Sequence, residues 1–144
     1  MSISFLYYAM LLFTLSFEDV QGVDQAPLKH LNDVQIYYFY DSRMPSEIGQ
    51  QIMYLTENLL SKQYQQLVAD GDIIFYKVDL ATPTGQKIAK KCDIVLNGLV
   101  VTRRSKIVDL TQKGYQLARS KPKAFQENLA YEIDRLLPKR KQPK

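Results

Sequence analysis

The feature that most constrains the fold is an apolar strand followed by a long amphipathic helix and a second strand. Residues 34–40 (Val-Gln-Ile-Tyr-Tyr-Phe-Tyr) are almost all β-branched or aromatic, which indicates an interior strand. A helix is predicted from Pro45 to Asp70-Gly71, with one apolar stripe made of Ile48, Ile52, Leu55, Leu59, Tyr64, Leu67 and Val68. Residues 73–80 alternate as a second strand. A strand, a helix and a second strand in this order predict a right-handed crossover connection. The two strands are therefore expected to pair in parallel within an α/β domain.

A shorter helix and a hairpin are predicted next. Thr82-Pro83 is a helix start, and the helix is expected to run to Lys91. Residues 99–102 and 107–110 are predicted to pair as a hairpin across the polar turn at residues 103–106. An anion-binding patch of Arg103, Arg104 and Lys106 is the alternative interpretation of that turn.

The last predicted element is a helix that opens at Ser120 and Pro122 and ends at Pro138. Its buried stripe is Phe125, Leu129, Ile133 and Leu136. The full order is β-α-β-α-β-β-α, which predicts one domain over residues 34–137. A mixed central sheet is expected, because it contains both a parallel pair and an antiparallel hairpin.

The N-terminal 22 residues are predicted to be an export signal. Residues 3–17 are apolar with few interruptions, and this run is shorter than the roughly 20 residues that span a membrane. Small residues at Val20 and Gly22 suit cleavage after Gly22, which leaves residues 23–33 as a lead-in. Retention of residues 3–17 as a membrane anchor is the alternative. Both interpretations place the domain outside the cytoplasm, in the periplasm or the cell exterior.

Several function classes are excluded by counting. Cys92 is the one cysteine and His30 the one histidine, so an internal disulfide and a cysteine-rich zinc site are ruled out. No metal and no cofactor is expected. The net charge of +4 owes much to a basic tail at residues 138–144, which is interpreted as a solvated terminus. Neither the tail nor the turn at residues 103–106 indicates a nucleic-acid partner.

The element order and several local patterns resemble the thioredoxin-like superfamily over residues 34–137. Aligned without gaps, residues 38–47 (Tyr-Phe-Tyr-Asp-Ser-Arg-Met-Pro-Ser-Glu) match the strand and helix start around the family's Cys-x-x-Cys motif. Lys-Val-Asp at residues 77–79 is similar to many family members, as is the hairpin at residues 99–110. The resemblance implies a thioredoxin-like three-layer α/β/α sandwich with a mixed central sheet.

The redox residues of the family do not occur at the matching positions. The two cysteine positions fall on Met44 and Glu47, which offer no thiol for attack or for resolution of a mixed disulfide. The aspartate that tunes proton transfer in the family is replaced by Tyr38. The family's cis-proline is expected near Asn97 or Gly98, but no proline occurs between residues 84 and 121. The resemblance therefore implies a member without thiol–disulfide catalysis.

Two functional hypotheses follow from this pattern. The first is a non-catalytic module that binds a peptide or protein partner through a loop and a neighbouring edge, made of Arg43, Met44, Pro45, Ser46, Glu47, Asn97 and Gly98. The same loop is interpreted alternatively as a degenerate remnant without function. The second hypothesis is a thiol–disulfide oxidoreductase or redox accessory that acts through Cys92 alone, although a small buried apolar role suits this cysteine better. A structural subunit of a membrane-associated complex is a further alternative if the N-terminal segment is retained.

Overall fold

A four-stranded mixed sheet forms the centre of the domain. The computed structural model describes residues 32–142, which belong to one compact unit. The strands are β1 (Val34–Tyr40), β2 (Ile73–Asp79), β3 (Gly98–Arg103) and β4 (Lys106–Asp109), and their order in the sheet is β2-β1-β3-β4. β1 pairs in parallel with β2 and antiparallel with β3, and β3 pairs antiparallel with β4. The expected parallel pair and hairpin are therefore confirmed.

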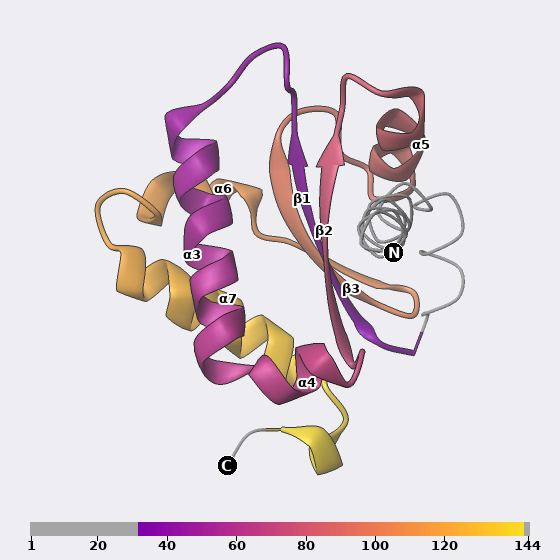
Figure 1. The fold of residues 1–144 in the computed structure, drawn as a ribbon, viewed down its shortest axis with the longest axis vertical. Coiled ribbons are helices and arrows are strands. Elements are labelled where there is room, and N and C mark those ends of the chain that lie inside the picture. Colours follow the sequence, from indigo (N-terminus) through magenta and orange to yellow (C-terminus); the bar gives the residue numbers. More distant parts are fainter. Residues whose placement is uncertain (1–31, 143–144) are drawn as a thin grey trace, which may run out of the picture. The chain divides into compact units, whose positions relative to one another are not determined.

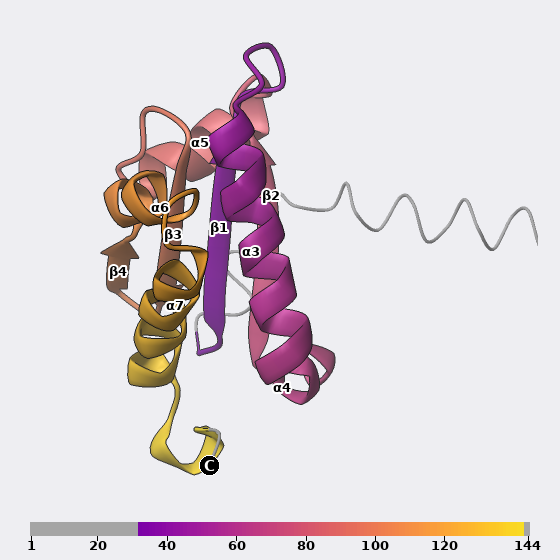
Figure 2. The same ribbon diagram turned by 90° about the vertical axis from the view of Figure 1, so that its left-hand side faces the viewer.

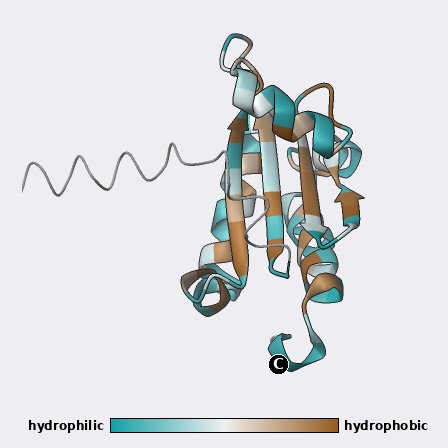
Figure 3. Cartoon of the chain, turned by 90° about the vertical axis from the view of Figure 1, so that its right-hand side faces the viewer, coloured by the Kyte–Doolittle hydropathy of each residue, from teal (hydrophilic) through white to brown (hydrophobic). Residues whose placement is uncertain are grey.

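Helices cover the two faces of the sheet unequally. α3 (Glu47–Gln63), α6 (Thr111–Leu117) and α7 (Pro122–Leu136) lie on one face, whereas α5 (Pro83–Lys91) lies on the other, against β2 (Figures 1 and 2). Figure 3 shows α5 across one end of its face of the sheet. The main core lies between the sheet and the first group of helices, and its fully enclosed side chains include Ile36, Leu99, Val101, Leu129 and Ile133. An α/β architecture with a mixed sheet is thus confirmed.

The predicted long helix is wrong in one respect, because it is interrupted at Tyr64. α3 ends at Gln63, and a separate short helix, α4 (Gln65–Ala69), follows. Tyr64 leaves the helical conformation with φ −122° and ψ 16°, and its ring is buried in the core. Its hydroxyl donates a hydrogen bond to the Asp134 carboxylate on α7 at 2.7 Å. Tertiary packing therefore outweighs the local apolar spacing that predicted one continuous helix.

α6 was not among the predicted elements. Its sequence, Thr-Gln-Lys-Gly-Tyr-Gln-Leu, has a glycine at its centre, which lowers helix propensity by about 1 kcal/mol relative to alanine. Gly114 allows close packing instead, because a Cβ there would lie 3.0 Å from Cδ1 of Ile52 and 3.5 Å from Cε2 of Phe125. The helix is thus stabilised by its contacts with α3 and α7 rather than by its own sequence.

Part of the basic segment that follows α7 is held against the domain. Residues Lys139–Lys141 form a 3₁₀ turn, η1, and Lys141 forms an ion pair with Asp72. The interpretation of the whole tail as solvated is therefore wrong for Lys141. Within residues 32–142 no helix has the length and apolar character needed to cross a membrane. The predicted export segment, residues 1–22, lies outside the described residues.

Candidate binding site

The sheet topology brings the two halves of the predicted site together where β1 ends and β3 begins. We call this end of the sheet the site edge. Phe39 near the end of β1 lies opposite Gly98 at the start of β3 in the antiparallel register. The loop that follows β1, residues 41–46, therefore lies beside the segment that precedes β3, residues 93–97. This edge is at the top of Figure 1.

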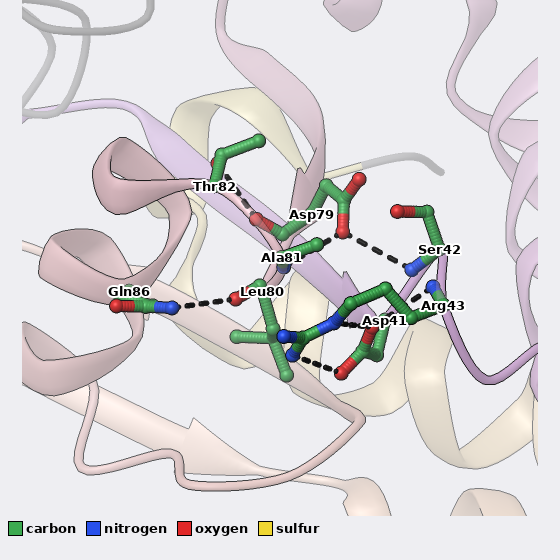
Figure 4. Close-up of polar contacts among 8 residues, drawn as sticks. All are labelled: Asp41, Ser42, Arg43, Asp79, Leu80, Ala81, Thr82 and Gln86. Atoms are coloured by element: carbon green, nitrogen blue, oxygen red, sulfur yellow. Dashed lines mark hydrogen bonds and ion pairs between the residues drawn. The ribbon is translucent and has the colours of Figure 1, made fainter.

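Asp41 holds the loop after β1 in a fixed conformation. Its carboxylate accepts hydrogen bonds from the backbone N–H of Arg43 at 2.9 Å and from the Nε and Nη2 groups of the same side chain at 2.9 and 2.7 Å (Figure 4). These bonds from Arg43 lower the pKa of Asp41 to about 2. Because Asp41 is ionised at neutral pH, it is poorly suited to act as a general acid.

A second carboxylate, Asp79 at the end of β2, joins this loop to the start of α5. It accepts hydrogen bonds from the backbone N–H groups of Ser42 at 3.1 Å and Ala81 at 2.9 Å (Figure 4). Hydrogen bonding by Ser42 and Ala81 lowers the pKa of Asp79. Both acidic side chains at this edge therefore serve backbone positioning.

α3 begins directly behind the loop. Ser46 is the N-cap residue, and its Oγ accepts a hydrogen bond from the backbone N–H of Gly49 at 3.1 Å. Glu47 lies in the first turn, where the helix dipole favours an acidic side chain. The cap explains why the chain turns into a helix immediately after Pro45.

The segment before β3 is shaped by the end of α5. The N–H of Asp93 donates to the carbonyl of Lys90 at 3.2 Å, and the N–H of Ile94 donates to that of Ala89 at 2.9 Å. This pair of bonds is a Schellman motif, in which the residue after the C-cap takes a left-handed conformation. Asp93 has φ 56°, although glycine is the more usual residue at such a position. The motif directs residues 95–97 away from the helix.

Two recesses meet at this edge. The first, of ≈ 560 Å³, lies between the loop and α5 and is lined by Arg43, Gln86, Lys90 and Ile94 among others. The second, of ≈ 410 Å³, lies between the loop and the start of α3 and is lined by Tyr38, Tyr40, Pro45 and Met53 among others. Asp41, Met44 and Asn97 line both recesses.

Three large apolar side chains stand exposed beside these recesses. Met44 is 65 % exposed, Val95 86 % and Leu96 73 %. Apolar side chains of this size that gather on a surface mark interaction sites more often than scattered ones do. We call Met44, Val95, Leu96 and Asn97, together with the two recesses, the Met44 surface.

The structure brings together most of the predicted site residues. Arg43 lines the first recess, Pro45 and Ser46 line the second, and Met44 and Asn97 line both.

Glu47 and Gly98 line neither recess. The Glu47 carboxylate lies 3.3 Å from Nη2 of Arg119, and both side chains are exposed. Gly98 is buried in β3, where a Cβ would lie 2.5 Å from Oγ1 of Thr111. Gly98 is therefore needed for close packing, because the same Oγ1 accepts a hydrogen bond from the backbone N–H of Leu99 at 3.0 Å.

Cys92 lies at the end of α5 and lines neither recess. Its side chain is half-buried, and burial raises the pKa of its thiol, whereas the neighbouring Lys91 acts in the opposite direction. A raised pKa reduces the thiolate fraction at neutral pH, and the thiolate is the nucleophile. The environment therefore favours an inert thiol.

The sequence did not single out Val95 and Leu96 as surface residues. An apolar pair beside Cys92 suggests a buried position, but it lies between the left-handed Asp93 and the strand start, outside any periodic element. That lack of periodicity is the signal that separates it from the core stripes.

Asp41 and Tyr38 each keep one protonation state at neutral pH. Burial raises the pKa of Tyr38 to about 12, so its hydroxyl stays protonated at neutral pH. Within residues 32–142 no group of three or more His, Cys, Asp or Glu side chains is arranged to hold a metal ion.

Comparison with known proteins supplies no relative: no protein-family model, no curated protein and no solved structure matches this chain.

Proposed function

We propose that this chain is a non-catalytic, thioredoxin-like domain of an exported protein, and that it binds an extended peptide or protein segment at the Met44 surface. The observation that carries the proposal is the cluster of Met44, Val95 and Leu96, exposed beside two recesses that meet at Asn97. The thioredoxin-like assignment is supported by the element order and the residue patterns described above.

The shape and chemistry of the surface favour an extended, largely apolar segment. Recesses on both sides of Met44 suit alternate side chains of an extended chain, which point to opposite sides. Methionine is flexible and polarisable, so it adapts to side chains of different shape. Polar groups at the rim are available to orient the backbone of such a segment, among them the Asn97 amide and the guanidinium N–H groups of Arg43 that do not bond to Asp41.

The alternative function, redox chemistry through Cys92, has less support. The thiol is half-buried, its pKa is raised, and it lies outside both recesses. An insulin-disulfide reduction assay separates the two functions. Turnover that is lost in Cys92→Ser would favour the redox function over the binding function.

The binding proposal is tested by selecting peptides on the exported form from a random heptapeptide phage library. We expect the selected peptides to bind the wild type and to lose more than roughly tenfold in affinity with Leu96→Asp, because a charge in an apolar contact must be desolvated. Tyr131→Asp is the matched control, since Tyr131 is also a large exposed side chain, at 65 % against 73 % for Leu96, but lies on α7. Equal affinity losses for the two variants would contradict a site at the Met44 surface.

The export proposal is tested separately, by mass spectrometry of the native N-terminus. A chain that begins at Val23 supports cleavage of the predicted signal. A chain that retains residues 3–17 supports the anchored alternative instead.

A further inference from the structure

The opposite end of the sheet, where β1 begins and β3 ends, carries a basic recess. It has a volume of ≈ 250 Å³ and lies between the β3–β4 turn, the start of β1 and the segment around η1. Four cationic and two acidic side chains line it, namely Arg103, Arg104, Arg140 and Lys141 with Asp33 and Asp72. Two basic segments that are far apart in the sequence thus meet at one place.

Two of these arginines are held in position by hydrogen bonds to uncharged acceptors. Nε of Arg103 donates to the backbone carbonyl of Asn32 at 2.9 Å, and Nε of Arg104 donates to the side-chain amide oxygen of the same residue at 3.3 Å. Both acceptors are uncharged. Among residues 32–142, neither guanidinium forms an ion pair, and no hydrogen bond engages the terminal Nη groups of either side chain.

The third arginine, Arg140, comes from η1 and is exposed. The remaining cation, Lys141, is paired with Asp72. That ion pair joins η1 to the residue before β2, and Arg140, the neighbour of Lys141, lines the recess. Three guanidinium groups that form no ion pair within residues 32–142 therefore line this polar recess, together with the carboxylate of Asp33.

The conformation at Arg104 is unusual for its residue type. Arg104 has φ 55°, in the left-handed region where glycine and asparagine are favoured. It occupies the tight turn between Arg103 and Lys106, which pair as the last residues of the hairpin. The turn itself is better served by asparagine, so Arg104 is replaceable there without harm to the fold.

We infer that this recess binds a phosphate group. Guanidinium groups donate paired, planar hydrogen bonds that match the oxygens of a phosphate, and three of them here come from two directions. The phosphate group of a soluble ligand and that of an anionic lipid headgroup share this chemistry. The inference is independent of the Met44 surface, which lies at the other end of β1.

The test uses the full chain and two probes. Pyrophosphate binding is measured by calorimetry, and vesicle binding by sedimentation with phosphatidylglycerol vesicles against phosphatidylcholine vesicles. We expect binding to pyrophosphate or an excess on phosphatidylglycerol, and a loss of roughly three- to tenfold with Arg104→Asn and with Arg140→Gln. The pyrophosphate arm identifies a soluble source of the phosphate, and an excess confined to vesicles identifies a lipid source.

Two controls separate a built site from general positive charge. Lys139→Gln removes the same charge one position before Arg140, and Lys106→Gln does so two positions after Arg104, but neither lysine lines the recess. We expect both controls to bind within about twofold of wild type, since exposed charges outside the site add little. Equal losses in all four variants, or no binding to either probe, would overturn the inference. Unchanged thermal unfolding of Arg104→Asn excludes misfolding as the cause of its loss.

Discussion

Replacement of Gly85 by alanine is expected to destabilise the domain, although alanine is the better helix former. Gly85 lies in the first turn of α5, beside the end of β2. A Cβ at this position would lie 1.9 Å from the carbonyl oxygen of Asp79, about 1.5 Å short of the 3.4 Å at which ordinary contact begins. It would also lie 2.9 Å from Oγ1 of Thr82, the N-cap of the helix.

The magnitude follows from which atoms must move. Overpacking costs roughly 1–3 kcal/mol, and the upper end applies here because the blocking atom belongs to the backbone. Alanine offsets up to about 1 kcal/mol of this cost, because it is a better helix former than glycine. The net loss is therefore about 2 kcal/mol, or roughly 10 °C in Tm for a domain of this size. Movement of α5 also displaces Gln86 and Lys90, which line the first recess.

Urea unfolding followed by circular dichroism measures this loss. Lys87→Ala is the matched control, because Lys87 lies in the same helix with its side chain in solvent. Its effect is expected to stay within about 0.5 kcal/mol. A Gly85→Ala variant as stable as wild type, or more stable, would refute the close approach of α5 to β2.

Three further predictions concern single side chains near the Met44 surface. The pKa of Asp41 is about 2 in the folded chain against 3.8 ordinarily, so the unfolded chain takes up the proton first. The stability that ionised Asp41 contributes is complete above about pH 4 and is lost as the pH falls toward 2. The urea midpoint of Asp41→Asn should therefore fall less steeply across this range than that of the wild type. Asp93→Gly relieves a left-handed aspartate and should raise the free energy of unfolding by roughly 0.5–1 kcal/mol; a lower urea midpoint would contradict this. The thiol of Cys92 should react with iodoacetamide more slowly in the native chain than in urea, and equal rates would show that it is not shielded.

Elements with a strong period were predictable from the sequence. The stripe Phe125, Leu129, Ile133 and Leu136 lies on the buried face of α7, as its spacing predicted. Thr82 caps α5 as predicted, with its Oγ1 3.0 Å from the N–H of Gly85. Both features depend on local spacing and side-chain chemistry, which the sequence states directly.

The features that were missed depend on contacts between distant residues. Gly114 disfavours a helix by itself, but it allows Ile52 and Phe125 to pack closely against α6. The helix α3 ends before Tyr64, whose hydroxyl donates a hydrogen bond to Asp134. The candidate site shows the same division. The loop around Met44 was predicted from the resemblance of residues 38–47 to a family's active-site segment. The exposure of Leu96, in contrast, follows from the left-handed Asp93, which local sequence does not reveal.

The binding account is tested most directly by methionine methyl resonances during titration with a selected peptide. Met44 lies at the junction of the two recesses and Met53 lines the second, so ¹³C-methyl labels report from within the proposed contact. We predict that the Met44 signal shifts in proportion to bound peptide, and that Leu96→Asp abolishes this shift at the same peptide concentration. Peptide binding that leaves the Met44 methyl resonance unchanged would contradict the account.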